Sequence, residues 1–232
     1  MLISRPTPCS TCPLRSVAPY GDEATSRASE IEALRKSSLT FPARRLIYRE
    51  GHESQEIYQL YDGWAFCYKT TSDGRRQILS FLLPGDTIGF PLLFGERMSF
   101  SVKALTALTA CAFDRQQLMA FLLSRPTLAK RVVALIGNMA NCTDEQLMNI
   151  GRHSASERIV RLIASIVKRL QVRGLGNGNV YPFPLTQLLL ADATGLTPIH
   201  VGRMLRDLRD DGLFTFDNKT LTVHDSARLL RE

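Results

Sequence analysis

The sequence lacks any apolar run approaching the roughly 18 residues that a membrane-spanning helix needs. Its first residues, MLISRPTPCSTC, contain no apolar stretch of the kind that a signal peptide requires. We therefore expect a cytoplasmic protein with no membrane partner.

Catalytic motifs are also missing. The sequence contains no nucleophile elbow, no phosphate-binding loop and no HExxH zinc motif. The four histidines are scattered along the chain, at His52, His153, His200 and His224. These absences disfavour an enzyme. There is likewise no internal repeat or low-complexity tract.

Cysteine is scarce, and its number is odd. Five cysteines in a chain without a secretory signal argue against a disulfide framework. Cys67 and Cys142 are expected in a strand and a helix, where a free cysteine is ordinary packing. Cys9 and Cys12 form a CxxC pair in an arm that we expect to be irregular and exposed, which is a weak signal by itself.

Positive charge is in excess, with a net charge of +7 and an isoelectric point of about 9.4. Such a balance suits a polyanionic partner. The excess is spread along the chain, so it supports a nucleic-acid partner without locating the surface.

Glycine punctuates residues 40–115, where short apolar segments alternate with glycines at intervals of roughly ten residues, a spacing typical of an antiparallel β-sandwich or barrel. Ser72-Asp73-Gly74 and the segment 84–86 are predicted turns. A short helix is expected over 25–37, before this region.

The next segment, residues 115–150, is predicted to be helical, with Pro126 in the first turn of a long helix. Leu128, Val132, Leu135 and Met139 follow a 4-3-4 spacing like that of a coiled-coil seam. We expect a dimer seam here, largely because of the resemblance described below. The alternative is a helix packed against its own barrel. A capping box, Ser154 to Glu157, is expected to begin a further helix.

Residues 187–206, QLLLADATGLTPIHVGRMLR, carry the most specific pattern, that of a helix-turn-helix. Ala191 is small where two helices must touch, and Gly195 permits a positive φ in the turn. Thr197 and Pro198 supply an N-cap and a first helical residue. The inward positions of the second helix are Val201, Leu205 and Leu208, and the outward ones are Ile199, His200, Gly202, Arg203 and Arg206. A plain helical hairpin is the alternative.

The segments 213–216 and 220–223 flank a short turn and predict a β-hairpin, the wing of a winged helix. Together these elements resemble the Crp/Fnr superfamily of bacterial transcription regulators, over nearly the whole chain. Residues 81–90, FLLPGDTIGF, look like its β-roll signature, and residues 185–208 look like its DNA-reading segment.

This resemblance implies an α+β fold with four parts. They are a cysteine-containing arm (1–24), a cyclic-nucleotide-binding-like sensor built as a double-stranded β-helix or cupin-like β-roll (25–118), a dimerisation helix (119–151) and a winged helix-turn-helix (152–232). It also implies a homodimer on a near-palindromic double-stranded DNA site, an effector acting through the roll, and a contact with RNA polymerase to which we assign no residue.

The resemblance also separates branches of the family. Cyclic-AMP binders need a glutamate after the last glycine of the roll and an Arg-Ser pair further on. Here Phe90 follows Gly89, and Met98 stands where that arginine belongs. An apolar side chain cannot replace a charge-assisted bond to phosphate, and Arg97 points to the other face of a strand. We therefore expect no cyclic AMP binding, and place the chain closer to the Fnr/FixK-like branch.

Members of the Fnr branch sense oxygen with an iron–sulfur cluster held by four cysteines. Cys9 and Cys12 look like the close pair of that motif, and Cys111 looks like its distant member. The remaining cysteine is missing, because its expected position is Ala18; Asp22 is the nearest carboxylate. Such a cluster usually demands four thiolates. Because one of the four cysteines is missing, several interpretations of the remaining three stay open. They are a three-cysteine or labile cluster, a thiol or disulfide switch or zinc site at the CxxC pair, haem or another small effector in the roll, and no redox role.

In Fnr-type proteins the reading helix presents a glutamate, a serine and an arginine to the bases. The matching positions here are Ile199, Gly202 and Arg203. Arginine suits guanine, and Ile199 suits a thymine methyl group. We expect Gly202 to let the backbone approach the DNA, and His200 either to contact it or simply to face solvent.

Thr186, Thr197 and Arg206 complete the DNA-binding candidates, with Thr186 and Arg206 assigned to phosphates, which position without specifying. Two alternatives to a signal-sensing DNA-binding regulator stay open. One is a cyclic-nucleotide-binding regulatory subunit, which Phe90, Met98 and the winged helix disfavour. The other is a constitutive or small-effector-controlled DNA-binding dimer without a metal cluster.

Overall fold

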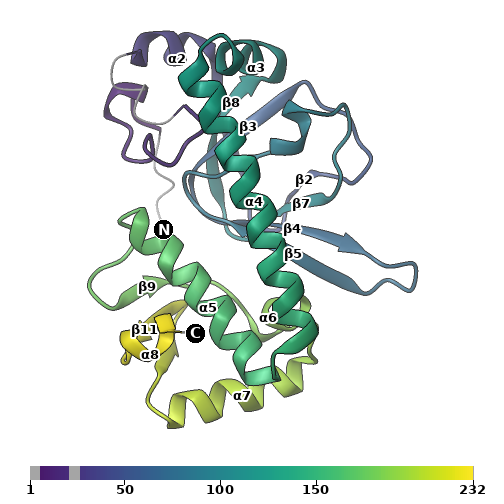
Figure 1. Ribbon diagram of the computed structural model, residues 1–232, viewed down its shortest axis with the longest axis vertical. Coiled ribbons are helices and arrows are strands. Elements are labelled where there is room, and N and C mark those ends of the chain that lie inside the picture. The colour runs from purple at the N-terminus through teal and green to yellow at the C-terminus, as the bar shows by residue number, and fades with distance from the viewer. Residues whose placement is uncertain (1–5, 21–26, 232) are drawn as a thin grey trace. The chain divides into compact units, whose positions relative to one another are not determined.

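The computed structural model describes residues 6–20 and 27–231 of the 232-residue chain, and the side chain of residue 231 is not described. The chain divides into two units (Figure 1). The first unit comprises residues 1–69 and 79–139, and the second comprises residues 70–78 and 140–232. Asp22, the carboxylate noted above, lies outside the described residues.

Two four-stranded antiparallel sheets form the β-roll, as the glycine spacing predicts. One sheet has the order β1 (Arg35–Phe41), β8 (Leu108–Asp114), β3 (Glu56–Asp62) and β6 (Thr87–Ile88). The other has the order β2 (Leu46–Tyr48), β7 (Ser101–Ala104), β4 (Ala65–Thr70) and β5 (Arg76–Leu82). Gly74, in the turn between β4 and β5, has a φ of +85°, which glycine adopts without strain.

Strand β8 is buried along its whole length except at Asp114. Its side chains alternate between two faces, so both faces must be covered. The N-terminal arm covers the face that carries Cys111 and Phe113, and the Tyr20 ring centroid lies 6.4 Å from that of Phe113. The arm contains a 3-10 turn, η1 (Cys9–Thr11), and is followed by helix α2 (Ala28–Leu34).

The arm therefore differs from the exposed segment expected from the sequence. The side chains of Cys9, Leu14, Ala18 and Tyr20 are all buried. Its few apolar residues form no sustained helical or strand pattern, and they become part of the core because they pack on the apolar face of β8. The helix expected over 25–37 is also shorter, because β1 begins at Arg35.

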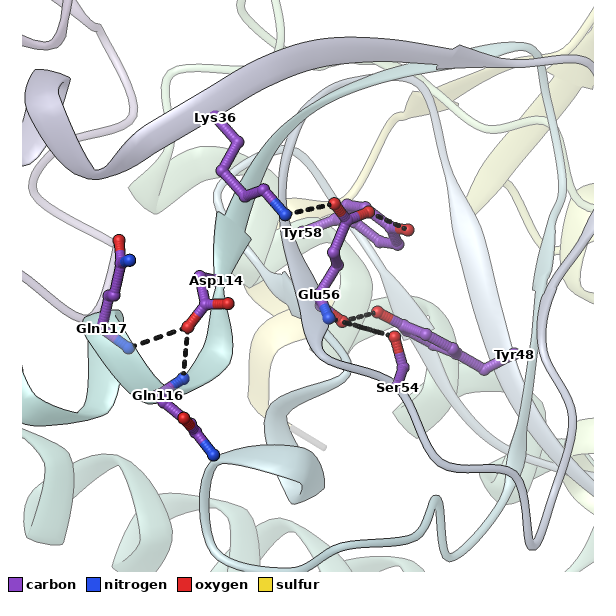
Figure 2. Close-up of polar contacts among 8 residues, drawn as sticks. All are labelled: Lys36, Tyr48, Ser54, Glu56, Tyr58, Asp114, Gln116 and Gln117. Atoms are coloured by element: carbon purple, nitrogen blue, oxygen red, sulfur yellow. Dashed lines mark hydrogen bonds and ion pairs between the residues drawn. The ribbon is translucent and has the colours of Figure 1, made fainter.

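A polar network around Glu56 joins three strands at one end of the roll (Figure 2). The hydroxyls of Tyr48 and Ser54 both donate to the backbone carbonyl of Glu56. The Glu56 carboxylate pairs with Lys36 Nζ at 2.9 Å and accepts from the Tyr58 hydroxyl at 3.3 Å. Burial, reinforced by this carboxylate, raises the pKa of Tyr58 to about 12. The network thus fixes β1, β2 and β3 against one another.

Asp114 ends β8 and caps α3 (Arg115–Leu123). Its carboxylate accepts from the backbone N–H groups of Gln116 and Gln117 at 3.0 Å each (Figure 2). A second helix, α4 (Pro126–Arg152), begins at the expected proline. The single helix predicted over 115–150 is therefore interrupted at residues 124–125, since proline disfavours a helical conformation in the residue before it.

Helix α4 corrects the proposed dimer seam. Leu128 and Val132 are only 1% and 2% exposed, and they belong to the core of the first unit. Leu128 and Val132 therefore pack against the chain's own β-roll, which is the alternative given above. The large apolar side chains that α4 leaves exposed are Val133, Ile136, Met139, Leu147, Met148 and Ile150.

The second unit contains the helix-turn-helix and wing (Figure 1). Helix α5 (Ala155–Val172) begins with the expected capping box. It is followed by β9 (Val180–Pro182), α6 (Gln187–Thr194), α7 (Pro198–Asp210), β10 (Phe214–Asp217), β11 (Thr220–Val223) and α8 (Ser226–Arg231). The wing hairpin, β10 and β11, is extended by β9 into a three-stranded antiparallel sheet that the sequence reasoning did not anticipate. Among the described helices, none combines the length and hydrophobicity needed to cross a membrane.

Candidate functional site

The turn between α6 and α7 depends on Gly195. Its φ is +70°, and its N–H donates to the carbonyl of Ala191 at 2.9 Å. A left-handed residue that closes a helix in this way is usually glycine, because a Cβ would be strained there. Leu196 N–H donates to the same carbonyl at 3.2 Å, so the last turn of α6 is satisfied and the chain can reverse.

Helix α7 begins as predicted. Thr197 is the N-cap, its hydroxyl oxygen accepts from His200 N–H at 3.3 Å, and Pro198 occupies the first helical position. Val201 is fully buried and Leu208 is 5% exposed, so these residues anchor the inner face of α7 in the second unit. Leu205 is only half-buried. One face of α7 is held and the opposite face is left to solvent.

That solvent face carries the predicted contact residues. Ile199 is 87% exposed, a large value for an apolar side chain on a structured helix. His200, Arg203 and Arg206 are also exposed. Arg203 Nη2 lies 2.8 Å from His200 Nε2, and because a guanidinium has no acceptor, the neutral imidazole accepts this hydrogen bond. The remaining guanidinium donors of Arg203 stay available.

Gln187, at the first residue of α6, is a residue that the sequence reasoning missed. A Cβ built on Gly202 would lie 2.9 Å from Gln187 Oε1, so the exposed Gln187 side chain lies over Gly202. The space at Gly202, expected to admit backbone close to DNA, therefore holds an amide group that can itself donate and accept. The only signal in the sequence is a polar residue directly after the N-cap Thr186, whose hydroxyl oxygen accepts from Leu189 N–H.

The three cysteines singled out by their spacing come together in the first unit. Cys9 and Cys12 from the arm and Cys111 from β8 line one cavity of about 10 Å³, together with Thr7, Leu14, Tyr20, Gln59, Leu60 and Tyr61. Cys9 and Cys111 are buried, whereas Cys12 is partly exposed, and all three are free thiols. The arm and β8 therefore meet at this cavity, although Cys12 and Cys111 are about a hundred residues apart along the chain.

Glu32 and Arg35 form an ion pair beside these thiols, with the Glu32 carboxylate at Cys9 and the Arg35 guanidinium at Cys111. Burial, together with a hydrogen bond to the Glu32 carboxylate, raises the pKa of Cys9 to about 12. Glu32 Oε2 also accepts from the backbone N–H of Cys9 at 2.7 Å. Burial raises the pKa of Cys111 as well, but the Arg35 guanidinium opposes this rise and donates to Cys111 Sγ at 4.0 Å.

This arrangement does not fit an iron–sulfur cluster. Such a cluster is usually held by four cysteine thiolates, whereas only three cysteines line this cavity. The position of the fourth cysteine is Ala18, which is 1% exposed. Within residues 6–20 and 27–231, no three or more His, Cys, Asp or Glu side chains are grouped so as to hold a metal ion. The cavity itself has room for about one water molecule.

The positions that bind cyclic AMP in related proteins are apolar here. Phe90 lies in the 3-10 turn η2 (Phe90–Leu93), and its ring centroid is 5.4 Å from that of Phe94. Met98 is 1% exposed and packs in the core of the roll. Neither residue offers a charge or a hydrogen-bond donor to a phosphate or ribose.

Comparison with known proteins agrees with this geometry. The family model described as "Cyclic nucleotide-binding domain" matches residues 38–125, and the one described as "Crp-like helix-turn-helix domain" matches residues 157–232. The transcriptional activator protein FnrL of Cereibacter sphaeroides is 28% identical over 228 residues, covering 97% of this chain and 91% of that protein. The nitrogen fixation regulation protein FixK of Rhizobium meliloti is 34% identical over 185 residues, covering 79% and 81%.

The fold has a solved counterpart in FixK2 from Bradyrhizobium japonicum. That structure superposes with a TM-score of 0.73 at 24% identity, covering 84% of this chain and 96% of the other. The β-roll, the helix-turn-helix with its wing and the likeness to FnrL and FixK over most of the chain lead to one conclusion: this chain belongs to the Crp/Fnr family of transcription regulators, in its Fnr/FixK branch.

Proposed function

We propose that this regulator reads a near-palindromic double-stranded DNA site as a homodimer, with α7 of each subunit in the major groove. The observation that carries the proposal is the construction of α7. Its start is fixed by Thr197, its inner face is buried through Val201 and Leu208, and its outer face presents Ile199 and Arg203 to solvent. Helix-turn-helix proteins contact base edges with the N-terminal part of such a helix.

Each exposed side chain then has a role in the proposal. Arg203 donates two hydrogen bonds to guanine O6 and N7, and Ile199 packs against a thymine methyl group. His200 accepts from Arg203 and so orients its guanidinium. Arg206 and the hydroxyls of Thr186 and Thr197 contact phosphates, which fix the register of the helix.

The dimer in this proposal forms through α4. Six large apolar side chains of α4 are exposed in the single chain, and exposed apolar side chains on one helix suit an interface with a second copy. Two-fold symmetry of the protein matches two half-sites one helical turn apart, hence a near-palindrome. In this proposal the protein acts in the cytoplasm, where the DNA lies, and contacts RNA polymerase. It catalyses no reaction.

The DNA site tests the assignment of the reading residues. Selection from a random pool is expected to return a half-site that differs from the ordinary Fnr half-site where glutamate and serine would read, because Ile199 and Gly202 cannot make those hydrogen bonds. The matched control is the double variant Ile199→Glu, Gly202→Ser, which restores both side chains and should shift the selected half-site toward the Fnr one. Recovery of the Fnr half-site by the unchanged protein would show that these residues do not set specificity.

The cofactor content tests the interpretation of the cysteine cavity. Protein purified without oxygen is expected to be colourless and to contain neither iron nor acid-labile sulfide, because only three of the usual four cysteines meet at this cavity and Ala18 stands at the fourth position. The measurement is an absorption spectrum with iron and sulfide assays per monomer. A brown protein with about four irons and four sulfides per monomer, bleached by air, would overturn this expectation and indicate a non-cysteine ligand.

A further inference from the structure

The cavity in the first unit places a partly exposed thiol beside a buried one. Cys12 is the only one of its three cysteines that is not buried, so it is the one that a dissolved oxidant reaches first. Cys111 lies at the centre of β8, paired with Ser38 of β1 and Gln59 of β3, and its sulfur faces the same cavity. Cys12 and Cys111 thus line the same cavity, which has a volume of only about 10 Å³.

Cys9 is set apart from these two by its contacts. Both its backbone N–H and its thiol are hydrogen-bonded to the Glu32 carboxylate, a negative charge that disfavours a Cys9 thiolate. Cys111 has the opposite neighbour, because the Arg35 guanidinium donates to its sulfur. A nearby positive charge favours the thiolate, which is the nucleophile in thiol chemistry. Cys111 is thus better suited than Cys9 to attack an oxidised Cys12.

We propose that Cys12 and Cys111 form a reversible disulfide when the protein meets a peroxide. The Cys12 thiolate attacks one oxygen of hydrogen peroxide, so an S–O bond forms, the O–O bond breaks, and hydroxide leaves as water after taking a proton. The Cys111 thiolate then attacks the sulfur of the Cys12 sulfenic acid. The S–S bond forms, the S–O bond breaks, and a second water leaves. Two thiols lose two electrons and two protons, and one peroxide becomes two waters.

The disulfide would tie the arm covalently to β8. The arm continues from Cys12 to residues that contact α4, because Arg131 donates to the backbone carbonyls of Ser16 and, at 3.2 Å, Ala18. The arm also packs tightly on the roll at Val17, whose Cγ2 lies 2.2 Å from where a Cβ on Gly85 would be. Oxidation therefore acts on a segment that the first unit holds from several sides, including the helix that carries the proposed dimer interface.

The test uses the 232-residue chain carrying Cys142→Ser, which removes the exposed thiol on α4 and so prevents linkage between subunits through that residue. The protein is reduced, freed of reductant under nitrogen, and treated with hydrogen peroxide. The intact mass is expected to fall by about 2 Da, the two hydrogens lost on disulfide formation, and to recover with a dithiol reductant. Peptide mapping without reduction should join the Cys12 peptide to the Cys111 peptide.

Matched variants in the same background assign the pair. Cys9→Ser should form the disulfide as the parent does, whereas Cys12→Ser and Cys111→Ser should lose it. A link between Cys9 and Cys12, oxidation of Cys12 without any link, or an unchanged mass would each overturn the proposal. Mapping of the parent protein decides the outcome even if a variant at the buried Cys111 fails to fold. Because the readout is chemical, it is independent of the proposed DNA reading.

Discussion

Glutamates at Ile136 and Leu147 of α4 are expected to convert the protein to a monomer and to weaken binding to a palindromic site by about 100-fold or more, since the second half-site is no longer engaged by the same molecule. Both side chains are exposed in the single chain, so neither substitution disturbs a core. In a dimer, each glutamate would be removed from water without a partner, which is costly.

The matched control adds the same charge to the other side of the helix. At 3.6 residues per turn, Ala134 and Asn138 lie away from the face defined by Ile136 and Leu147, and both are exposed. The double variant Ala134→Glu, Asn138→Glu should remain dimeric and bind normally. Sedimentation gives the oligomeric state, and fluorescence anisotropy gives the affinity. A glutamate variant at 136 and 147 that stays dimeric would place the interface elsewhere.

Replacing Arg203 by alanine is expected to cost about 1–3 kcal/mol of binding free energy and to relax specificity at one base pair. The reason is that the guanidinium is the one fully ionised, multi-donor group among the outward residues in the first two turns of α7, which are Ile199, His200, Gly202 and Arg203. The variant also removes the partner of His200 Nε2, leaving that nitrogen to water. The measurement is the affinity for the selected site and for its single-base changes, at one salt concentration.

Arg206→Ala is the matched comparison. Arg206 lies one turn further along α7, where we assign it to a phosphate, so its loss should weaken binding to all sequences equally and reduce the dependence of affinity on salt. Arg203→Ala should instead leave binding to random DNA nearly unchanged. An equal loss on specific and random DNA would assign Arg203 to the phosphates as well.

The helix-turn-helix and the wing are predictable from the sequence because they rest on local backbone chemistry. Gly195 is needed for the positive φ, Thr197 supplies the cap, and Pro198 fits only at the start of a helix. The capping box at Ser154 and the start of α4 at Pro126 follow the same short-range rules. Glycines at turn spacing likewise indicated the β-roll, although not the order of its strands.

Long-range packing decided the rest. The spacing of Leu128 and Val132 is the same for a dimer seam as for a helix on its own core, and only the roll beneath α4 shows which applies. Gln187 joins the reading face because its side chain lies beside Gly202 of α7, where there is no side chain to exclude it.

The arm shows the same limit at the cysteines. Spacing singled out Cys9, Cys12 and Cys111 by their residue type, but no sequence rule states that the arm folds over β8 and encloses them. The helix starts, the turn and the reading helix follow from the sequence, since they depend on neighbours a few residues away. The burial of Cys9 and Cys111, the carboxylate of Glu32 beside Cys9 and the guanidinium of Arg35 beside Cys111 follow only from the tertiary structure, since these contacts join distant segments.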